Sequence, residues 1–177
     1  LGVTGTNGKT TTTTLLTEVM ESTGLPIKVG GNIGDSLSEA AYHMPKGGYL
    51  VAELSSYQLE TIKSFCPLGA IVLNVTPDHL ARHKTMKNYA AAKARIFMNQ
   101  KSDNFVVLND DDSIVAAMKH DAHSKILSIS QHHKVENGAY FEGDTCYAVL
   151  DGKAIPIIDT EHIHIKGSHN IENILAV

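Results

Sequence analysis

The chain has 177 residues, of which 42% are hydrophobic, enough for one domain with a substantial core and with little room for a second. Its formal net charge of −4 and its scattered lysines and arginines give no electrostatic case for nucleic acid as a partner. Two cysteines are too few for a disulfide framework, and no apolar run approaches the length of a membrane span. We therefore expect a cytoplasmic protein that binds neither nucleic acid nor a membrane.

The first ten residues predict a phosphate-binding loop. A short apolar strand is followed by a tight loop at Gly5 to Gly8 and by a helix from Lys9 onward. Such a loop directs backbone N–H groups to one point, at the positive end of the helix dipole, which suits phosphate oxygens. Lys9 would reach the β- and γ-phosphates, and the Thr10 hydroxyl would hold Mg²⁺. Val3 stands where the strict motif has a glycine, so the alternative is an ordinary glycine-rich strand-to-helix turn.

Apolar runs and helix-forming segments then alternate as far as about residue 130. Strands are expected at 27–29, 49–52, 69–75, 105–108 and 126–129, and helices at 9–23, 37–43, 87–100 and 113–119. This alternation predicts an α/β fold with a mostly parallel, P-loop-type sheet flanked by helices. In such sheets, ligands bind beyond the carboxyl ends of the strands. The polar residues expected at those ends are Gly5 to Thr10, Asn32, Glu53, Asp78 and His79.

The pattern changes after about residue 135. Glycine-containing turn sequences separate short apolar runs at 139–141, 146–150 and 154–158, which predict antiparallel hairpins in a small subsidiary sheet. His162 and His164 alternate with isoleucines, and we interpret them as the solvent face of an edge strand rather than as a metal site. A closing helix from about Ser168 places Asn170 and Asn173 on one face.

Three of the following four side chains are candidates for chemistry, each with a structural alternative, and the fourth, His83, is discounted. Glu53 ends a buried strand, where a carboxylate would complete the Mg²⁺ coordination begun by Thr10; otherwise it caps a helix or lies in solvent. His79 follows a strand and a proline turn, and is either a ligand or a loop histidine. We discount His83, four residues after His79, because no acid or third histidine completes a zinc motif. Lys93 lies among alanines on a helix, and its default interpretation is a solvated surface lysine.

Four stretches together resemble the Mur ligase family, ATP-dependent enzymes that form the amide bonds of the peptidoglycan stem peptide. They are Thr4-Gly5-Thr6-Asn7-Gly8-Lys9-Thr10-Thr11, Asn74-Val75-Thr76-Pro77-Asp78-His79-Leu80, Tyr89-Ala90-Ala91-Ala92-Lys93 and Gly167-Ser168-His169-Asn170-Ile171-Glu172-Asn173. Within the family, residues 31–34 and 53–60 are most similar to the branch that adds D-glutamate to UDP-N-acetylmuramoyl-L-alanine. The resemblance implies that residues 1–177 are the central ATP-binding domain of a three-domain enzyme. The N-terminal UDP-binding domain and the C-terminal amino-acid-binding domain would lie outside them, and we expect a monomer.

The resemblance also implies a role for each matching residue. The residues from Gly5 to Thr11, together with Asn170 and Asn173, would contact ATP. The UDP-linked substrate would be contacted by Asn32, Ser55 and His79. Two Mg²⁺ ions would be held by Thr10, Glu53, His79 and Lys93, the last after carbamylation, which turns the cation into a carboxylate-like anion. Lys9, His79 and Lys93 would be the catalytic residues.

One position departs from the family's pattern. Ala81 stands where the family usually has an aspartate, two residues after the histidine, so the metal or loop network differs there or this protein tolerates the loss.

The reaction implied by the resemblance proceeds through an acyl phosphate. The L-alanyl carboxylate attacks the γ-phosphate of ATP, and the amine of D-glutamate then attacks the acyl phosphate and expels phosphate. Lys9 and two Mg²⁺ ions would neutralise charge on the transferred group. The fragment alone is expected to be inactive. The alternatives are another Mur-type or a folylpolyglutamate-type ligase, and a P-loop nucleotide-binding module that makes no amide.

Overall fold

The strands of the fold form one nine-stranded sheet, in the order β2-β3-β1-β4-β5-β6-β7-β8-β9. The protein was analysed as a computed structural model, which describes residues 1–165 and 167–177. All neighbours from β2 to β7 in this order pair in parallel, which confirms the predicted α/β class. The parallel strands are β1 (Gly2–Thr4), β2 (Ile27–Gly31), β3 (Tyr49–Glu53), β4 (Gly69–Val72), β5 (Phe105–Asn109), β6 (Lys125–Ser130) and β7 (Gly138–Glu142).

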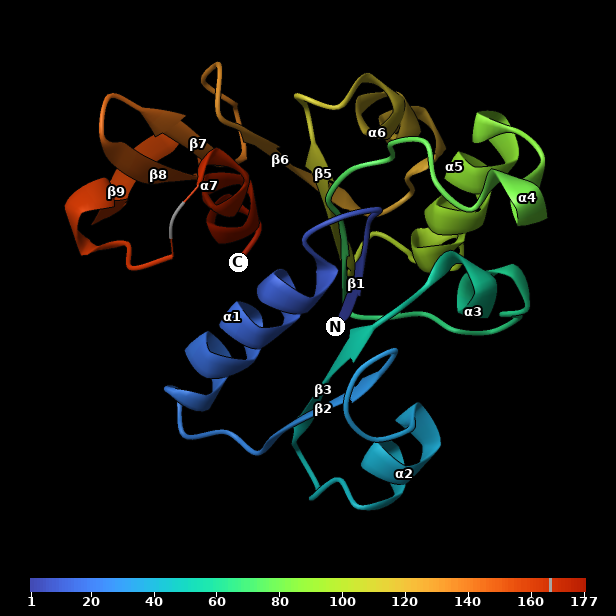
Figure 1. Ribbon diagram of the computed structural model, residues 1–177. Coiled ribbons are helices and arrows are strands. Elements are labelled where there is room, and N and C mark those ends of the chain that lie inside the picture. The colour runs from blue at the N-terminus through green and yellow to red at the C-terminus, as the bar shows by residue number, and fades with distance from the viewer. Residues whose placement is uncertain (166) are drawn as a thin grey trace.

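Helices connect these strands and cover both faces of the sheet (Figure 1). They are α1 (Lys9–Glu21), α2 (Leu37–Tyr42), α3 (Ser56–Glu60), α4 (Leu80–His83), α5 (Met86–Ala94), α6 (Ser113–Ala117) and α7 (Ser168–Leu175). Short 3-10 turns follow at η1 (Arg95–Phe97), η2 (Met118–Asp121) and η3 (Thr160–His162). The helix expected over 87–100 is thus an α-helix that tightens into a 3-10 turn. Within the described residues, no helix is long and apolar enough to span a bilayer.

Two hydrophobic cores lie on opposite faces of the sheet, because successive residues of a strand point to opposite sides. In β4, Ile71 belongs to the core beneath α1 and α7, whereas Val72 belongs to the core beneath α3, α5 and α6. Both residues are at most 4% exposed. A strand buried on both faces is continuously apolar rather than alternating, as the sequence of β4 indicates.

The predicted antiparallel hairpins are present as β7, β8 (Thr145–Leu150) and β9 (Lys153–Asp159). They are continuous with the parallel strands, however, because β7 pairs with β6 in the register Ser128↔Gly138. The expectation of an edge strand at His162 and His164 is wrong. His162 ends the 3-10 turn η3 and His164 lies outside any strand, although both are exposed as expected.

Candidate active site

The loop between β1 and α1 has the predicted strand–loop–helix geometry, and it depends on a glycine at its end. Gly8 precedes α1 with φ of 83°, in the left-handed region that side chains disfavour. A Cβ atom at this position would lie 2.3 Å from Oδ1 of Asn173 in α7. Helix α7 therefore packs directly against the loop, and no other residue fits at Gly8 without displacing it.

Asn74, which follows β4, holds the same loop through its side chain and its backbone carbonyl. The backbone N–H of Asn7 donates to Asn74 Oδ1 at 2.8 Å, and that of Thr6 donates to the Asn74 carbonyl at 2.8 Å. Asn74 Nδ2 in turn donates to the Asn7 carbonyl and to Glu172 of α7. The N–H groups of Thr6 and Asn7 are thus used within the protein. The N–H groups of the first turn of α1 have no helical acceptor and point to where an anion would lie.

Two lysines converge on one carbonyl oxygen of the loop. Lys9 Nζ donates to the carbonyls of Gly5 and Thr6 at 3.0 and 2.9 Å, and Lys93 Nζ donates to the carbonyl of Gly5 at 2.6 Å. Lys93 is only 1% exposed, so its default interpretation as a surface lysine is wrong. Burial, and to a lesser degree the charge of Lys9, together lower the pKa of Lys93 to about 7, against the opposite effect of Asp78.

Tyr89 joins helix α5 to the loop beside these lysines. Its ring centroid lies 4.6 Å from Lys93 Nζ, and its hydroxyl lies 3.3 Å from Thr6 Oγ1. Burial raises the pKa of Tyr89, so the phenol stays protonated and available for hydrogen bonding. The resemblance assigned a role to Lys93 but none to Tyr89, which begins the same resembling stretch and holds the lysine.

Glu53 ends β3 as a buried carboxylate with neutral hydrogen-bond partners. Its Oε2 accepts from Thr10 Oγ1 at 2.9 Å and its Oε1 accepts from Asn32 Nδ2 at 2.8 Å, while only 1% of the residue is exposed. Among residues 1–165 and 167–177, no cationic side chain forms an ion pair with it. A buried anion needs a compensating charge, and the carboxylate and hydroxyl oxygens are the ligands that Mg²⁺ prefers. The residues therefore fit a magnesium ion.

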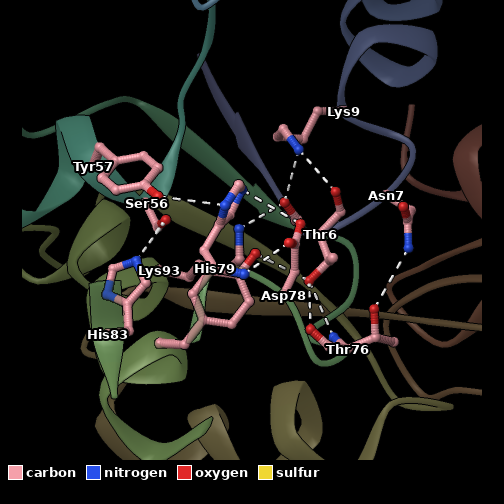
Figure 2. Close-up of polar contacts among 12 residues, drawn as sticks. Thr6, Asn7, Lys9, Ser56, Tyr57, Thr76, Asp78, His79, His83 and Lys93 are labelled. Atoms are coloured by element: carbon pink, nitrogen blue, oxygen red, sulfur yellow. Dashed lines mark hydrogen bonds and ion pairs between the residues drawn. The ribbon is translucent and has the colours of Figure 1, made fainter. Parts of the chain in front are cut away.

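His79 lies across from the loop, at the start of α4. It has a positive φ of 51°, unusual for a residue with a side chain, and its side chain is 45% exposed. Its Nδ1 lies 3.4 Å from the Tyr57 hydroxyl and its Nε2 lies 3.4 Å from Asp78 Oδ2 (Figure 2). The imidazole is thus oriented by both neighbours while remaining open on one side.

These side chains surround a polar pocket of about 250 Å³. The residues that line it come from α1, the loop after β2, the N-cap and first turn of α3, the turn before α4, and α5: Lys9, Asn32, Ser55, Ser56, Tyr57, His79, Tyr89 and Lys93. The structure thus brings together the expected substrate residues with both lysines. It also shows that Ser55 caps α3, since its hydroxyl accepts from the Gln58 N–H.

The two asparagines of α7 are not among the residues that line this pocket. Asn173 Nδ2 donates to Asn170 Oδ1 at 3.0 Å, which confirms that they share a helix face. Asn173 Oδ1 accepts from Thr12 Oγ1 at 3.1 Å, and the residue is 2% exposed. In this arrangement Asn173 supports the loop beneath Gly8.

His83 is a residue that the sequence reasoning discounted and that the structure places in a hydrogen-bonded network. The acid that appeared to be missing comes from α3, where Glu60 Oε1 lies 3.1 Å from His83 Nδ1. Ser56 Oγ lies 2.9 Å from His83 Nε2. Because the partners are separated by more than twenty residues, no local pattern could reveal the contact.

Comparison with known proteins gives a consistent result. The family model of the Mur ligase middle domain matches residues 3–177 of this chain. The chain is 48% identical to the UDP-N-acetylmuramoylalanine–D-glutamate ligase of Thermoanaerobacter pseudethanolicus, over 98% of this chain and 38% of the relative. It is 46% identical to the ligase of the same name from Desulfitobacterium hafniense, over 99% of this chain and 39% of the relative. The chain therefore spans about two-fifths of the length of these relatives.

Solved structures agree on the fold. A UDP-N-acetylmuramoyl-L-alanyl-D-glutamate–2,6-diaminopimelate ligase superposes with a TM-score of 0.77 at 27% identity, over 99% of this chain and 41% of that one. MurF from Acinetobacter baumannii superposes with a TM-score of 0.73 at 19% identity, over 99% of this chain and 40% of that one, a likeness of fold alone.

Proposed function

The chain belongs to the Mur ligase family, and from this premise we propose that it is the ATP-binding middle domain of an enzyme that joins D-glutamate to UDP-N-acetylmuramoyl-L-alanine. The identity of 46–48% to D-glutamate ligases supports this acceptor. Because those relatives are more than twice as long, the domains that hold the UDP group and D-glutamate would lie outside residues 1–177. We place the whole enzyme in the cytoplasm as a monomer that binds neither nucleic acid nor a membrane.

The first step is phosphoryl transfer from ATP to the L-alanyl carboxylate. The phosphates would lie on the N–H groups of the first turn of α1, and Lys9 would leave the Gly5 and Thr6 carbonyls to meet the γ-phosphate. A bond forms between a carboxylate oxygen and the γ-phosphorus as the bond from that phosphorus to the β-phosphate oxygen breaks, which gives the acyl phosphate and releases ADP. The amine of D-glutamate then displaces phosphate from the acyl phosphate, and the amide forms.

Glu53 and Thr10 would hold one Mg²⁺, and His79 together with carbamylated Lys93 would hold a second. When bound, these ions neutralise charge that develops on the transferred phosphoryl group. Carbamylation requires the neutral amine, and a pKa of about 7 leaves much of Lys93 neutral near physiological pH. The buried Glu53 carboxylate, bonded to the loop threonine and lacking an ion-pair partner among the described residues, is the single observation that carries this assignment.

The substrate would enter through the polar pocket between the loop and α3. Asn32 and Ser55 line this pocket beside His79, which supports a role for them in contacting the UDP-linked substrate near its reacting carboxylate. Because Asn32 also bonds Glu53, its orientation is fixed before any substrate arrives.

The test is phosphate release by the full-length protein with ATP and UDP-N-acetylmuramoyl-L-alanine while the acceptor is varied. Release that depends on D-glutamate, and not on L-glutamate, L-lysine or meso-diaminopimelate, is the expected result. Release with another acceptor would retain the ligase and overturn the D-glutamate assignment. No release with any acceptor would reduce the conclusion to a nucleotide-binding domain.

A further inference from the structure

His83 lies one helical turn after His79, and the two imidazole rings contact the same pair of tyrosines. The His79 ring lies 5.2 Å from that of Tyr57 and 6.1 Å from that of Tyr89. The His83 ring lies 5.7 Å and 5.0 Å from the same two rings. The two histidines differ in exposure, because the His79 side chain is 45% exposed and the His83 side chain is 2% exposed. One ring therefore faces the pocket while the other is fixed in the protein.

Both nitrogens of the buried His83 ring form polar contacts with side chains of helix α3. Ser56 Oγ lies 2.9 Å from Nε2, and Glu60 Oε1 lies 3.1 Å from Nδ1 of His83. Arg82 Nη2 donates to the other oxygen of Glu60 at 2.8 Å and lowers the pKa of that carboxyl group. Two bonds at opposite sides of an imidazole leave it no freedom to rotate, so His83 is a rigid link between α3 and α4.

The backbone carries this link directly to His79. The N–H of His83 donates to the His79 carbonyl at 3.1 Å, and Asn88 Nδ2 donates to the His83 carbonyl at 2.9 Å. A single helical turn has little stability of its own. His79 at φ 51° and Lys84 at φ 69° bound this turn in conformations that L-residues disfavour. Contacts from outside α4 must therefore maintain the turn.

We propose that His83 is a positioning residue, clamped between Ser56 and Glu60, that holds the α4 turn and so directs His79 into the pocket. The residues of α4 itself provide no acid, so the clamp takes its carboxylate from α3. Tyr57 and Tyr89 complete the alignment by packing on both histidines. The catalytic consequence rests on the proposed function, in which His79 binds metal, whereas the placement of His79 by His83 does not.

The first experiment observes the placement itself in the full-length protein. In His83→Phe the ring still packs between the tyrosines but both hydrogen bonds are lost. The ¹H–¹³C signal of the His79 imidazole, assigned by its absence in His79→Ala, should shift and broaden. Ser56→Ala and Glu60→Gln each disturb one bond and should shift the same signal less. If His83→Phe does not fold, the Ser56→Ala and Glu60→Gln variants still test the proposal. The control His120→Phe changes an exposed histidine in η2 and should leave the signal unchanged. An unmoved His79 signal in folded variants would overturn the proposal.

The second experiment is a double-mutant cycle on Mn²⁺ binding in the presence of ATP, followed by electron paramagnetic resonance. His83→Phe should weaken Mn²⁺ binding about tenfold, the effect of losing a group that orients a metal ligand. On a His79→Ala background the same change should cost less than twofold, since His83 acts through His79. Equal losses on both backgrounds would make His83 merely structural and overturn the proposal. If His79→Ala alone leaves Mn²⁺ binding unchanged, the metal role of His79 in the proposed function fails, and the imidazole signal alone decides the role of His83.

Discussion

At the carboxyl edge of the parallel strands, charged and polar side chains are buried, whereas in the hairpins of β8 and β9 apolar side chains are exposed. Glu53 and Lys93 are each 1% exposed, while Leu150 and Ile157 are 58% and 62% exposed. Burying a charge is costly unless hydrogen bonds or an opposite charge compensate it. A region that buries charged side chains therefore indicates a function rather than a contribution to stability. The hairpins show the opposite arrangement. Their strands pair with neighbours in the sequence through short turns, and apolar side chains remain exposed. The difference agrees with the proposal that the active site lies at the carboxyl edge of the parallel strands.

The largest expected effect is a loss of activity on substitution at the carboxyl edge of the parallel strands, with no loss on substitution in the hairpins. Lys9→Met should reduce ATP-dependent phosphate release by the full-length enzyme by about a thousandfold, because the cation that we propose for the γ-phosphate is lost. The matched change Lys153→Met in β9 should leave the rate unchanged. Comparable losses in both variants, measured as kcat/KM, would contradict the assignment of the loop.

A pair of glycines compares the two regions by stability. Gly8→Ala should cost about 3 kcal/mol, since a positive φ and a collision with the buried Asn173 side chain add together. Gly152→Ala in the β8–β9 turn has a similar φ of 73° but nothing within 4 Å, and should cost about 1 kcal/mol. Urea unfolding of both variants measures the difference. Equal costs would show that backbone strain alone matters at Gly8.

The buried lysine gives a pH-dependent prediction. Its pKa falls from 10.5 to about 7 on folding, so between these values the unfolded chain binds more protons and stability rises with pH. Lys93→Met removes this penalty but also the bond to Gly5, leaving a net gain of roughly 2 kcal/mol at pH 6.5. The gain should vanish toward pH 10, and Lys134→Met in an exposed ion pair should show no such trend. A gain in Tm that is independent of pH would show that the lowered pKa of Lys93 is not the cause of the gain.

The smallest effect concerns one hydroxyl group. Tyr89→Phe should cost about 1 kcal/mol, because the hydrogen bond to Thr6 is lost while the ring remains. Tyr147→Phe in β8 keeps its stacking on Tyr140 and should change stability by less than half as much. The free energies of unfolding of the two variants check this contrast, and a larger loss at Tyr147 would reverse it.

Local sequence predicted the parallel sheet, the strand–loop–helix geometry of the first residues and the position of Glu53, since each depends on neighbouring residues. Lys93 is different, because its alanine-rich helix has no local feature that indicates burial; the burial arises from Tyr89 and from the Gly5 carbonyl, far away in sequence. The same holds for the Glu60–His83 contact. The pairing of β7 with β6 was also beyond prediction, since strand register between separate segments is decided by packing. His162 shows that alternating residues do not suffice for a strand where a 3-10 turn forms instead.

The strand order has a consequence for how the chain reaches its fold. The phosphate loop follows β1, where Gly2 pairs with Ala52 on one side and Ala70 on the other. The hairpin of β8 and β9 instead begins with neighbours, Leu150 beside Lys153. Closing long loops slows folding, so the hairpins can form early while β1 must wait for β3 and β4. We expect nucleotide binding to appear only in the last kinetic phase of refolding, which makes it a reporter of the completed sheet.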